Sequence, residues 1–213
     1  MKKLNVFLRF HLGGINRKIR NIFLRIKFNK YIGDDNFKII SQNCIGTMIY
    51  HDLGIRFNSP TINLYMESQD FIKFIENLDY YLSVDAKKIK FITSDDYPIG
   101  YLEDLKIYFV HYSNENEVIK CWNRRRKRVN FDKIYIIMID RDGCNEEIIN
   151  RYDNVTYENK LFFSNKPLNK KTLKIIYMPC FKKLKTVGSL TEFSNIFGKR
   201  YYEKYFDYID WLR

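Results

Sequence analysis

Short apolar runs alternate with amphipathic segments along most of this chain. The strongest run is Lys133–Ile139 (KIYIIMI), whose apolar and β-branched residues predict a central strand buried on both faces. Shorter runs predict further strands at residues 37–40, 61–66, 89–93, 105–110, 161–163 and 173–178.

Apolar residues at helical spacing predict helices between these strands. Residues 70–82 carry an apolar face and are preceded by Ser68 as an N-cap, and residues 115–128 also have a helical pattern. Residues 145–152 predict a short helix capped by Asn145. The alternation predicts an α/β fold, a three-layer α/β/α arrangement with a mostly parallel central sheet.

The first 33 residues differ from the rest of the chain. Ile15, Ile19, Ile22, Phe23 and Ile26 recur at helical spacing with basic residues between them, which predicts a basic amphipathic N-terminal helical arm. Such a helix can lie in an anionic membrane interface, or it can pack its apolar stripe on the body and solvate its basic face. The domain organisation predicted is an arm over residues 1–33 and a single α/β domain over 34–213 with a helical, aromatic-rich tail.

The net charge of +12 is concentrated in that arm. Residues 1–33 carry nine Lys and Arg and no acid, whereas the remaining 180 residues carry 28 basic and 25 acidic side chains. Binding of nucleic acid by the whole protein is therefore not expected. The arm instead predicts an anionic membrane surface as a partner.

Composition limits the class of protein and the cellular compartment that we expect. Aromatic residues make up 17% of the chain, and there are only 4 Pro and 9 Gly, as in a packed globular protein. The 4 cysteines form no C-x-x-C pair, so neither a disulfide framework nor a zinc site is expected. No apolar run reaches the ~18 residues of a membrane span, and no secretory signal is recognisable. We expect a cytoplasmic protein, peripheral to the inner face of the membrane.

Most of the predicted strands end in polar or reactive residues. In a parallel sheet, ligands bind outside the carboxyl ends of the strands, so these residues predict one shared crevice. The alternative is that loops after strands are polar simply because they are solvated. The residues concerned are Ser41, Asn43 and Cys44, then Glu67, Thr93–Asp96, His111, Asp140–Asp142, Ser164 and Asn165.

Asp140 and Asp142 follow the strongest strand at a spacing that suits a hard divalent cation. Mg²⁺ or Mn²⁺ held there would bridge a substrate diphosphate. The alternative is that Asp142-Gly143 forms a turn. Phosphate contacts are predicted for Arg141 and for the basic end of the helix over 115–128, where the alternative is stabilisation of the helix dipole. The candidates on that helix are Arg124, Arg125 and Arg128.

A second chemistry is predicted around Cys44. A strand meets a helix N-terminus at Cys44, which would lower the thiol pKa, and His51 or His111 with an aspartate would complete a nucleophilic arrangement. The alternatives are a buried, unreactive thiol and a local His51-Asp52 pair; otherwise His51 and Asp52 are candidates for substrate binding. No Walker-type or G-x-G-x-x-G motif is present.

Several segments resemble an uncharacterised bacterial family, usually described as exopolysaccharide-biosynthesis-like, that has a domain of unknown function. They include ISQNCIGTMIYHDLGIRFNSPTINLY, DFIKFIENLDYYL, YPIG, WNRRRKR and IMIDRDGC, in that order over residues 37–180. The resemblance implies an α/β fold and a surface-glycan context, and it implies no catalytic residues.

Three functions follow as expectations. The first is a transferase in surface polysaccharide biosynthesis, with metal-assisted glycosyl transfer from a nucleotide sugar to a glycan or lipid-linked acceptor. His111 or Glu67 would be its base. The second is a Cys-dependent hydrolase or acyl-type transferase acting on glycans. The third is a non-enzymatic binding module tethered to a membrane or to nucleic acid.

Overall fold

A computed structural model describes residues 2–129 and 131–213, with side chains from residue 15 onward. Contacts divide the chain into two compact units. The terminal unit contains the chain up to Asp35, Met48–Arg56 and Ser189–Arg213, and the sheet unit contains Asn36–Thr47 and Phe57–Gly188.

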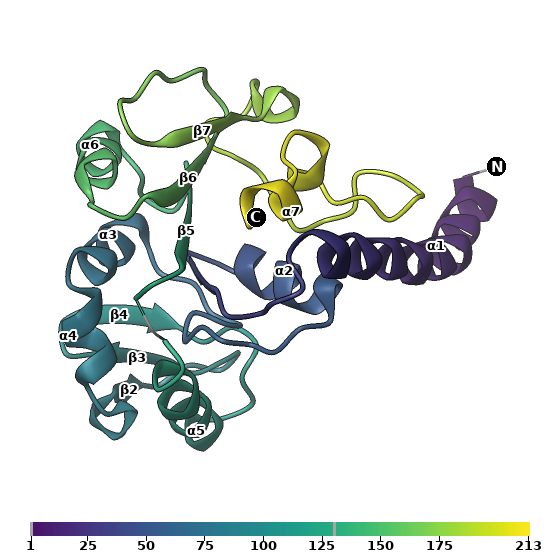
Figure 1. Ribbon diagram of the computed structural model, residues 1–213. Coiled ribbons are helices and arrows are strands. Elements are labelled where there is room, and N and C mark those ends of the chain that lie inside the picture. The colour runs from purple at the N-terminus through teal and green to yellow at the C-terminus, as the bar shows by residue number, and fades with distance from the viewer. Residues whose placement is uncertain (1, 130) are drawn as a thin grey trace. The chain divides into compact units, whose positions relative to one another are not determined.

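A four-stranded parallel sheet forms the centre of the sheet unit (Figure 1). Its strands are β1 (Lys38–Ser41), β5 (Ile134–Ile139), β6 (Asn159–Ser164) and β7 (Lys174–Tyr177), in the order β1-β5-β6-β7. All three strand pairs are parallel, so the four carboxyl ends share one edge. Every residue of β5 is buried, which confirms the predicted central strand. The α/β class, the mostly parallel sheet and the N-terminal helix are all confirmed.

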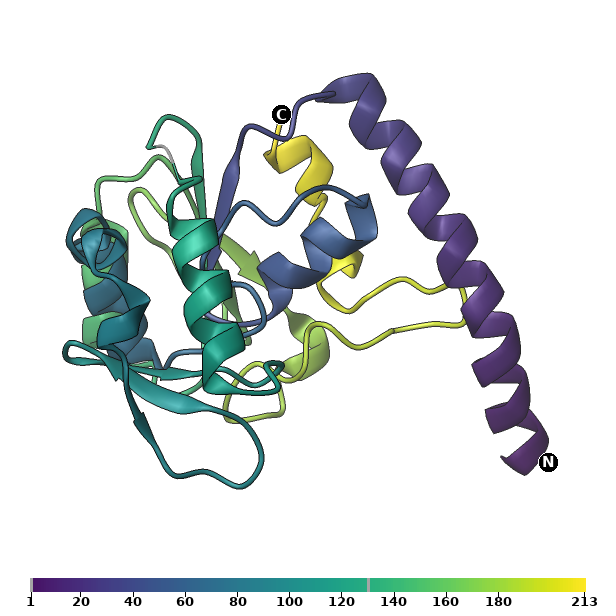
Figure 2. The same cartoon turned by 90° about the horizontal axis from the view of Figure 1, so that it is seen from below.

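A second, antiparallel sheet was not predicted. It contains β2 (Lys90–Ile92), β3 (Ile99–Leu102) and β4 (Leu105–Tyr108), which lie next to α5 (Glu115–Arg126) in Figure 2. Ile99 and Gly100 lie at the start of β3, and a Cβ on Gly100 would lie 2.5 Å from Ile89 Cγ2. Thr93–Asp96 therefore belong to the β2–β3 connection and not to the carboxyl edge of the parallel sheet.

The predicted strand over residues 61–66 is wrong. Asn63 has a left-handed φ of 63°, and only one isolated bridge, between Tyr65 and Tyr108, joins this segment to β4. The turn at Asn63 prevents a continuous ladder, although the segment still runs beside the end of β4.

Four helices and two 3₁₀ turns complete the sheet unit. The predicted helix over 70–82 is two helices, α3 (Ser68–Glu76) and α4 (Leu78–Ser83), because Asn77 leaves the helical conformation at φ −127° and ψ 37°. The N-cap of α3 is Glu67 rather than Ser68. Two further helices, α5 (Glu115–Arg126) and α6 (Glu146–Asn154), are capped by Asn114 and Asn145. The 3₁₀ turns are η1 (Ala86–Lys88) and η2 (Pro179–Phe181).

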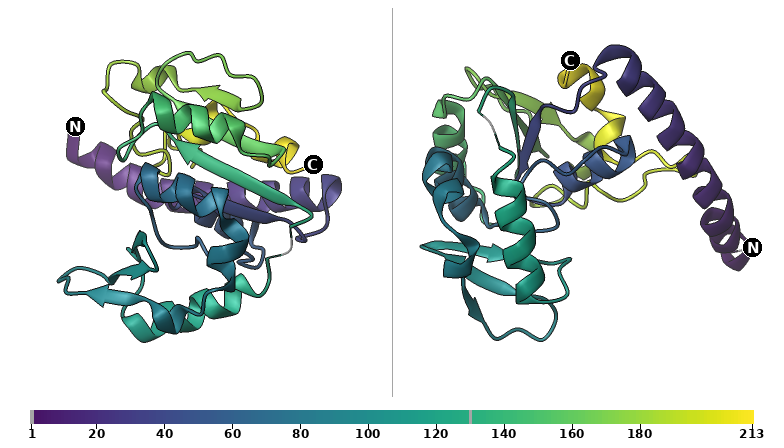
Figure 3. Two further views of the ribbon diagram at one scale, coloured as in Figure 1. Left: turned by 90° about the vertical axis from the view of Figure 1, so that its left-hand side faces the viewer. Right: turned by 60° about the horizontal axis from the view of Figure 1, so that its bottom comes forward.

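The core of the sheet unit lies between these helices and the two sheets. Figure 3 (left) shows α3 and α6 on the same face of the parallel sheet. Trp122 of α5 is 1% exposed, and its ring centroid lies 6.2 Å from that of Phe74 and 6.5 Å from that of Phe109. Burying three aromatic side chains of this size fixes α5 to α3 and to the end of β4.

The terminal unit is built from the two ends of the chain. Its first helix, α1 (Lys2–Tyr31), is continuous in Figure 2 (purple). The second half of α2 (Ile45–Leu53), from Met48 onward, belongs to this unit. Regular helix in the described tail is limited to η3 (Tyr202–Lys204) and α7 (Tyr208–Trp211), much less than the sequence pattern suggests. No helix in the described part of the chain is long and apolar enough to cross a membrane.

Candidate functional site

The Asp140–Asp142 segment follows β5 at the carboxyl edge of the parallel sheet and forms a tight turn. The Cys144 N–H donates to the Arg141 carbonyl at 3.2 Å, and Asp142 and Gly143 both have left-handed φ values, 54° and 81°. Two consecutive left-handed residues define a type I′ turn, for which Asp-Gly is a preferred pair. The expected Asp142-Gly143 turn is thus present, and the Asp140 and Asp142 side chains leave a turn rather than a straight strand.

Two buried side chains outside this turn hold it in place. The Ser68 N–H and Oγ donate to the carbonyls of Asp142 (2.8 Å) and Arg141 (2.7 Å). The Gln42 amide donates to Ser68 Oγ at 2.9 Å and accepts from the Ile139 N–H at 3.0 Å. Gln42 is fully buried and joins the ends of β1 and β5 to the start of α3. The sequence reasoning missed this role, although an amide directly after an apolar strand was a usable signal.

Asp140 is the half-buried acid of the site. Burial raises the pKa of Asp140, while the hydrogen bond from Ser164 and the charge of Lys166 act in the opposite direction. Ser164 Oγ, at the end of β6, lies 3.3 Å from the Asp140 carboxylate. The Asp142 carboxylate instead pairs with its neighbour Arg141, at 3.2 Å from Nε. At this edge, Asp140 therefore lies beside the Ser164 hydroxyl and the charge of Lys166, whereas Asp142 lies beside Arg141.

Three other predicted residues at the edge have structural contacts. Asn43 accepts from the Ile45 N–H at 3.2 Å, at the start of α2. Ser41 N–H donates to Thr61 Oγ1 at 3.0 Å, and Asn165 donates to the Leu184 carbonyl at 2.6 Å. Within the described chain, Ser41 Oγ and Asn165 Oδ1 are buried without a hydrogen-bond partner. These two unsatisfied atoms, one at the end of β1 and one just after β6, leave unused hydrogen-bonding capacity at the edge.

Glu67 belongs to an aromatic group that the sequence reasoning did not identify. The rings of Tyr65 and Tyr108 stack at 4.3 Å between centroids with 7° between their planes. The Tyr108 hydroxyl donates to Glu67 at 3.0 Å, and Lys106 Nζ lies 4.9 Å from the centre of the Tyr108 ring. Burial, followed by a neighbouring Tyr97, raises the pKa of Tyr65, and Asp142 adds to this effect. The interaction with Asp142 connects this aromatic group to the Asp140–Asp142 turn.

The cysteines do not have the expected electrostatics. Burial raises the pKa of Cys44 to about 11, opposite to the lowering expected at a helix start. Its Sγ lies 3.9 Å from the Leu64 carbonyl, an environment that does not stabilise a thiolate. Burial, with the nearby charge of Asp140, also raises the pKa of Cys144 to about 12. Neither thiol is prepared for nucleophilic attack at neutral pH.

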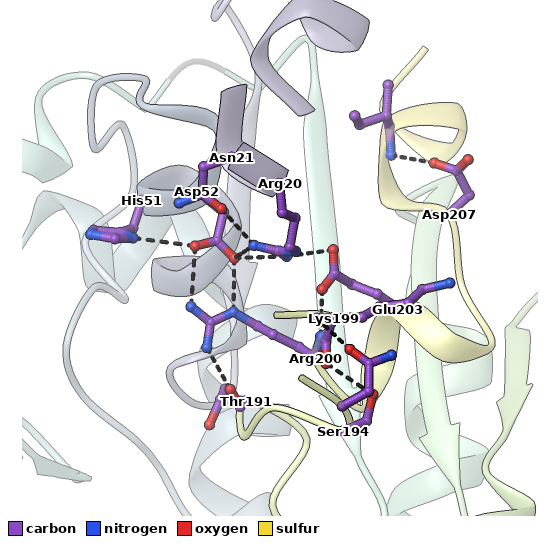
Figure 4. Close-up of polar contacts among 12 residues, drawn as sticks. Arg20, Asn21, His51, Asp52, Thr191, Ser194, Lys199, Arg200, Glu203 and Asp207 are labelled. Atoms are coloured by element: carbon purple, nitrogen blue, oxygen red, sulfur yellow. Dashed lines mark hydrogen bonds and ion pairs between the residues drawn. The ribbon is translucent and has the colours of Figure 1, made fainter. Parts of the chain in front are cut away.

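His111 and His51 make contacts with groups other than the Cys44 thiol. His111 is exposed after β4, and its backbone N–H donates to the Asn63 carbonyl at 3.3 Å. No hydrogen bond joins its ring to the Cys44 thiol in the part of the chain that the structure describes. His51 and Asp52 belong to the terminal unit, where Asp52 is 1% exposed and accepts from Arg20 and Arg200 (Figure 4). His51 is exposed and lies 3.3 Å from Asp52, as a local pair.

The basic end of α5 makes side-chain contacts with Phe57, Tyr112 and Cys121. Arg125 is buried, donates to the Tyr112 hydroxyl at 2.5 Å and lies 5.5 Å from the centre of the Phe57 ring. Arg128 donates to the Phe57 carbonyl at 3.0 Å, and Arg124 donates to Cys121 Sγ at 3.5 Å. Arg141 and Lys166 are instead the cations that lie beside Asp142 and Asp140.

Comparison with known proteins places the sequence of this chain in a family. The profile of a domain of unknown function, DUF1919, matches residues 15–213. The chain is also similar to an uncharacterized protein of Haemophilus influenzae, with 37% identity over 198 residues, 93% of this chain and 94% of that protein. Neither match carries a described activity or a link to exopolysaccharide.

Proposed function

The chain belongs to the DUF1919 family, and we propose that it is a transferase acting on a phosphate-bearing sugar at the carboxyl edge of the parallel sheet. The observation that carries the proposal is the Asp140–Asp142 turn directly after the buried central strand. Open parallel sheets bind ligands at this edge. Asp140 lies beside Lys166 and the Ser164 hydroxyl, and Asp142 lies beside Arg141, a mixture that suits a phosphorylated sugar.

Asp140 and Asp142 would hold Mg²⁺ or Mn²⁺ on the diphosphate of a nucleotide sugar. Among the described residues, no group of three or more His, Cys, Asp and Glu side chains is placed to hold a metal ion. Mg²⁺ is commonly bound through one or two carboxylates, with phosphate oxygens and water as its other ligands, so Asp140 and Asp142 would need to supply only one or two ligands. A bound cation neutralises the diphosphate leaving group. Its charge would also offset the burial that raises the pKa of Asp140.

Tyr65 and Glu67, both held by the buried Tyr108, support a sugar as the second ligand. An aromatic ring offers an apolar surface to the C–H face of a sugar, and a carboxylate accepts from sugar hydroxyls. Glu67 is exposed and held by the Tyr108 hydroxyl, so it is our candidate base for an acceptor hydroxyl. A surface-glycan pathway remains part of this proposal and rests on the sequence resemblance alone. The raised pKa of Cys44 argues against the cysteine-dependent alternative.

Thermal unfolding with a panel of nucleotide sugars, with and without Mn²⁺, tests the donor site. A ligand that binds only the folded state adds about 2.7 kcal/mol at a hundredfold excess over its dissociation constant. We expect a metal-dependent rise in Tm with one nucleotide, lost in the Asp140→Asn/Asp142→Asn double variant. Exposed Asp79 on α4 supplies a control, Asp79→Asn, that should keep the rise. A Tm rise that survives in the double variant, or no rise with any donor, would contradict the proposal.

A further inference from the structure

One face of α1 is apolar and exposed. The exposed fractions are 60% for Ile15, 46% for Ile19, 56% for Ile22, 66% for Phe23 and 58% for Ile26. At about 100° per residue, these five side chains fall within an arc of roughly 100° along the helix. A stripe of this width is the face that a surface helix normally buries.

The opposite face of α1 makes the contacts within the terminal unit. Asn16 donates to the Ile196 carbonyl at 2.9 Å, and the Arg17 guanidinium lies 4.7 Å from the centre of the Phe193 ring. Arg20 pairs with Asp52 at 3.0 Å and with Glu203 at 2.5 Å (Figure 4), and Lys27 pairs with Asp207. Within the terminal unit, the apolar stripe is therefore not the face that makes these contacts. Acids and carbonyls hold the polar face, which leaves the stripe uncovered.

The basic residues of α1 fall into two groups. Arg20 and Lys27 are neutralised by acids of the tail and of α2. Lys18, Arg25 and Lys30 are exposed; by helical spacing, Lys18 and Arg25 lie along one side of the apolar stripe, and Lys30 follows the stripe one turn after Ile26. The sequence up to residue 33 contains no acid, so no negative charge of α1 opposes them.

We propose that this face of α1, the stripe Ile15, Ile19, Ile22, Phe23 and Ile26 with Lys18 and Arg25 along one side and Lys30 after it, lies in the surface of an anionic lipid bilayer. Apolar side chains would enter the boundary between headgroups and acyl chains while the basic residues meet lipid phosphates and carboxylates. The partner is a membrane surface with negative lipids, and the helix axis lies in the plane of that surface.

A second copy of the chain is the rival occupant of the stripe. Ile15, Ile19, Ile22 and Ile26 are spaced by four, three and four residues, a pattern that also suits a helical pair. In such a pair the residues flanking the seam would include Lys18 and Arg25, with no acid on the partner helix to face them. Like charges at those positions oppose self-pairing and attract an anionic surface.

Co-sedimentation of the full chain with vesicles tests the proposal. We expect pelleting with vesicles of phosphatidylcholine plus phosphatidylserine, much less with phosphatidylcholine alone, and a decrease at high salt. Phe23→Ser should lower the partition coefficient by roughly tenfold or more, the effect of withdrawing one aromatic side chain from the interface. Phe197→Ser is a matched control, because Phe197 is 68% exposed in the tail, outside α1.

Two further measurements separate a loss of lipid binding from a loss of folding and from self-association. Both phenylalanines are exposed, so neither serine variant should change the Tm, and an unchanged Tm separates lost binding from lost folding. Sedimentation velocity without lipid reports self-association. A dimer that Phe23→Ser dissociates would overturn the proposal in favour of a second copy. Equal pelleting of wild type and Phe23→Ser, or pelleting that is independent of phosphatidylserine, would also overturn it.

Discussion

Asp52→Ala should be among the most destabilising single changes in the terminal unit. The Asp52 carboxylate is 1% exposed and accepts from Arg20 at 3.0 Å and from Arg200 at 2.7 and 3.1 Å. Arg20 also pairs with Glu203 at 2.5 Å, so two cations and two carboxylates form a neutral buried group. Removing Asp52 would leave two largely buried guanidinium groups with one acid.

The magnitude follows from the partners that each arginine keeps. Removing one member of a buried ion pair costs about 3–5 kcal/mol, because the remaining charge stays desolvated. Arg20 would keep Glu203, and Arg200 would keep the Thr191 carbonyl at 2.5 Å and the Phe193 ring at 4.5 Å. Because of these remaining contacts, we expect Asp52→Ala to lower the free energy of unfolding by about 3 kcal/mol, near the lower end of that range. Asp52→Asn keeps an acceptor oxygen and should cost less, about 2 kcal/mol.

Urea unfolding followed by circular dichroism measures this change. Asp210→Ala removes an exposed acid of the same unit and serves as the control, with an expected change below about 0.5 kcal/mol. A loss below about 1 kcal/mol for Asp52→Ala would refute the reasoning, because it would mean that the two arginines are solvated without their partner.

The contribution of Asp52 to the free energy of unfolding should also depend on pH. Burial alone would raise the pKa of Asp52, but the hydrogen bond and charge of Arg200 and the charge of Arg20 lower it. A lowered folded-state pKa contributes stability above the unfolded-state pKa of about 3.9, and that stability is lost as the pH falls through the folded-state pKa. The difference between wild type and Asp52→Asn should therefore be full at pH 7 and shrink only in acid below about pH 4. A difference that is independent of pH would indicate lost packing instead.

Asp140 and Cys44 each give one further prediction, the first about stability and the second about reactivity. Burial raises the pKa of Asp140, so ionising this acid costs the folded state stability at neutral pH. Asp140→Asn should raise the Tm at pH 7, and the gain should disappear as the pH falls below the unfolded-state pKa of about 3.9; a lowered Tm at pH 7 would contradict this account. Burial also raises the pKa of Cys44 to about 11, so alkylation by iodoacetamide, followed by mass spectrometry, should be slow at pH 7 and still accelerate above pH ~9. Rapid alkylation at pH 7 would return Cys44 to the list of nucleophiles.

The sequence pattern predicted the elements that are stabilised by residues within one short stretch of the chain. The apolar residues of β5 and the Asn145 cap of α6 appear where the sequence places them, because burial on both faces and capping each have a short-range signature. The carboxyl edge followed from the parallel order of β1, β5 and β6. The segment over 61–66 failed because the left-handed Asn63 interrupts a run that looks continuous in sequence.

The sequence pattern did not predict contacts between residues that are far apart in the chain. Asp52 looked like half of a local His51-Asp52 pair, yet its main partners, Arg20 and Arg200, are 32 and 148 residues away. The aromatic group around Glu67 depends likewise on Tyr108, 41 residues further along the chain. Helical spacing identified the stripe on α1 but not which face is exposed, because that depends on acids in α2 and the tail.

The two proposals can fail independently, and this allows each to be judged alone. The donor site uses residues of the sheet unit, whereas the lipid-binding face uses only α1 of the terminal unit. Asp140→Asn/Asp142→Asn should therefore abolish the metal-dependent rise in Tm and leave vesicle binding unchanged. Phe23→Ser should reduce vesicle binding and leave the rise intact. If either variant abolished both properties while keeping its fold, the two functions would be coupled, and neither group of residues would act on its own.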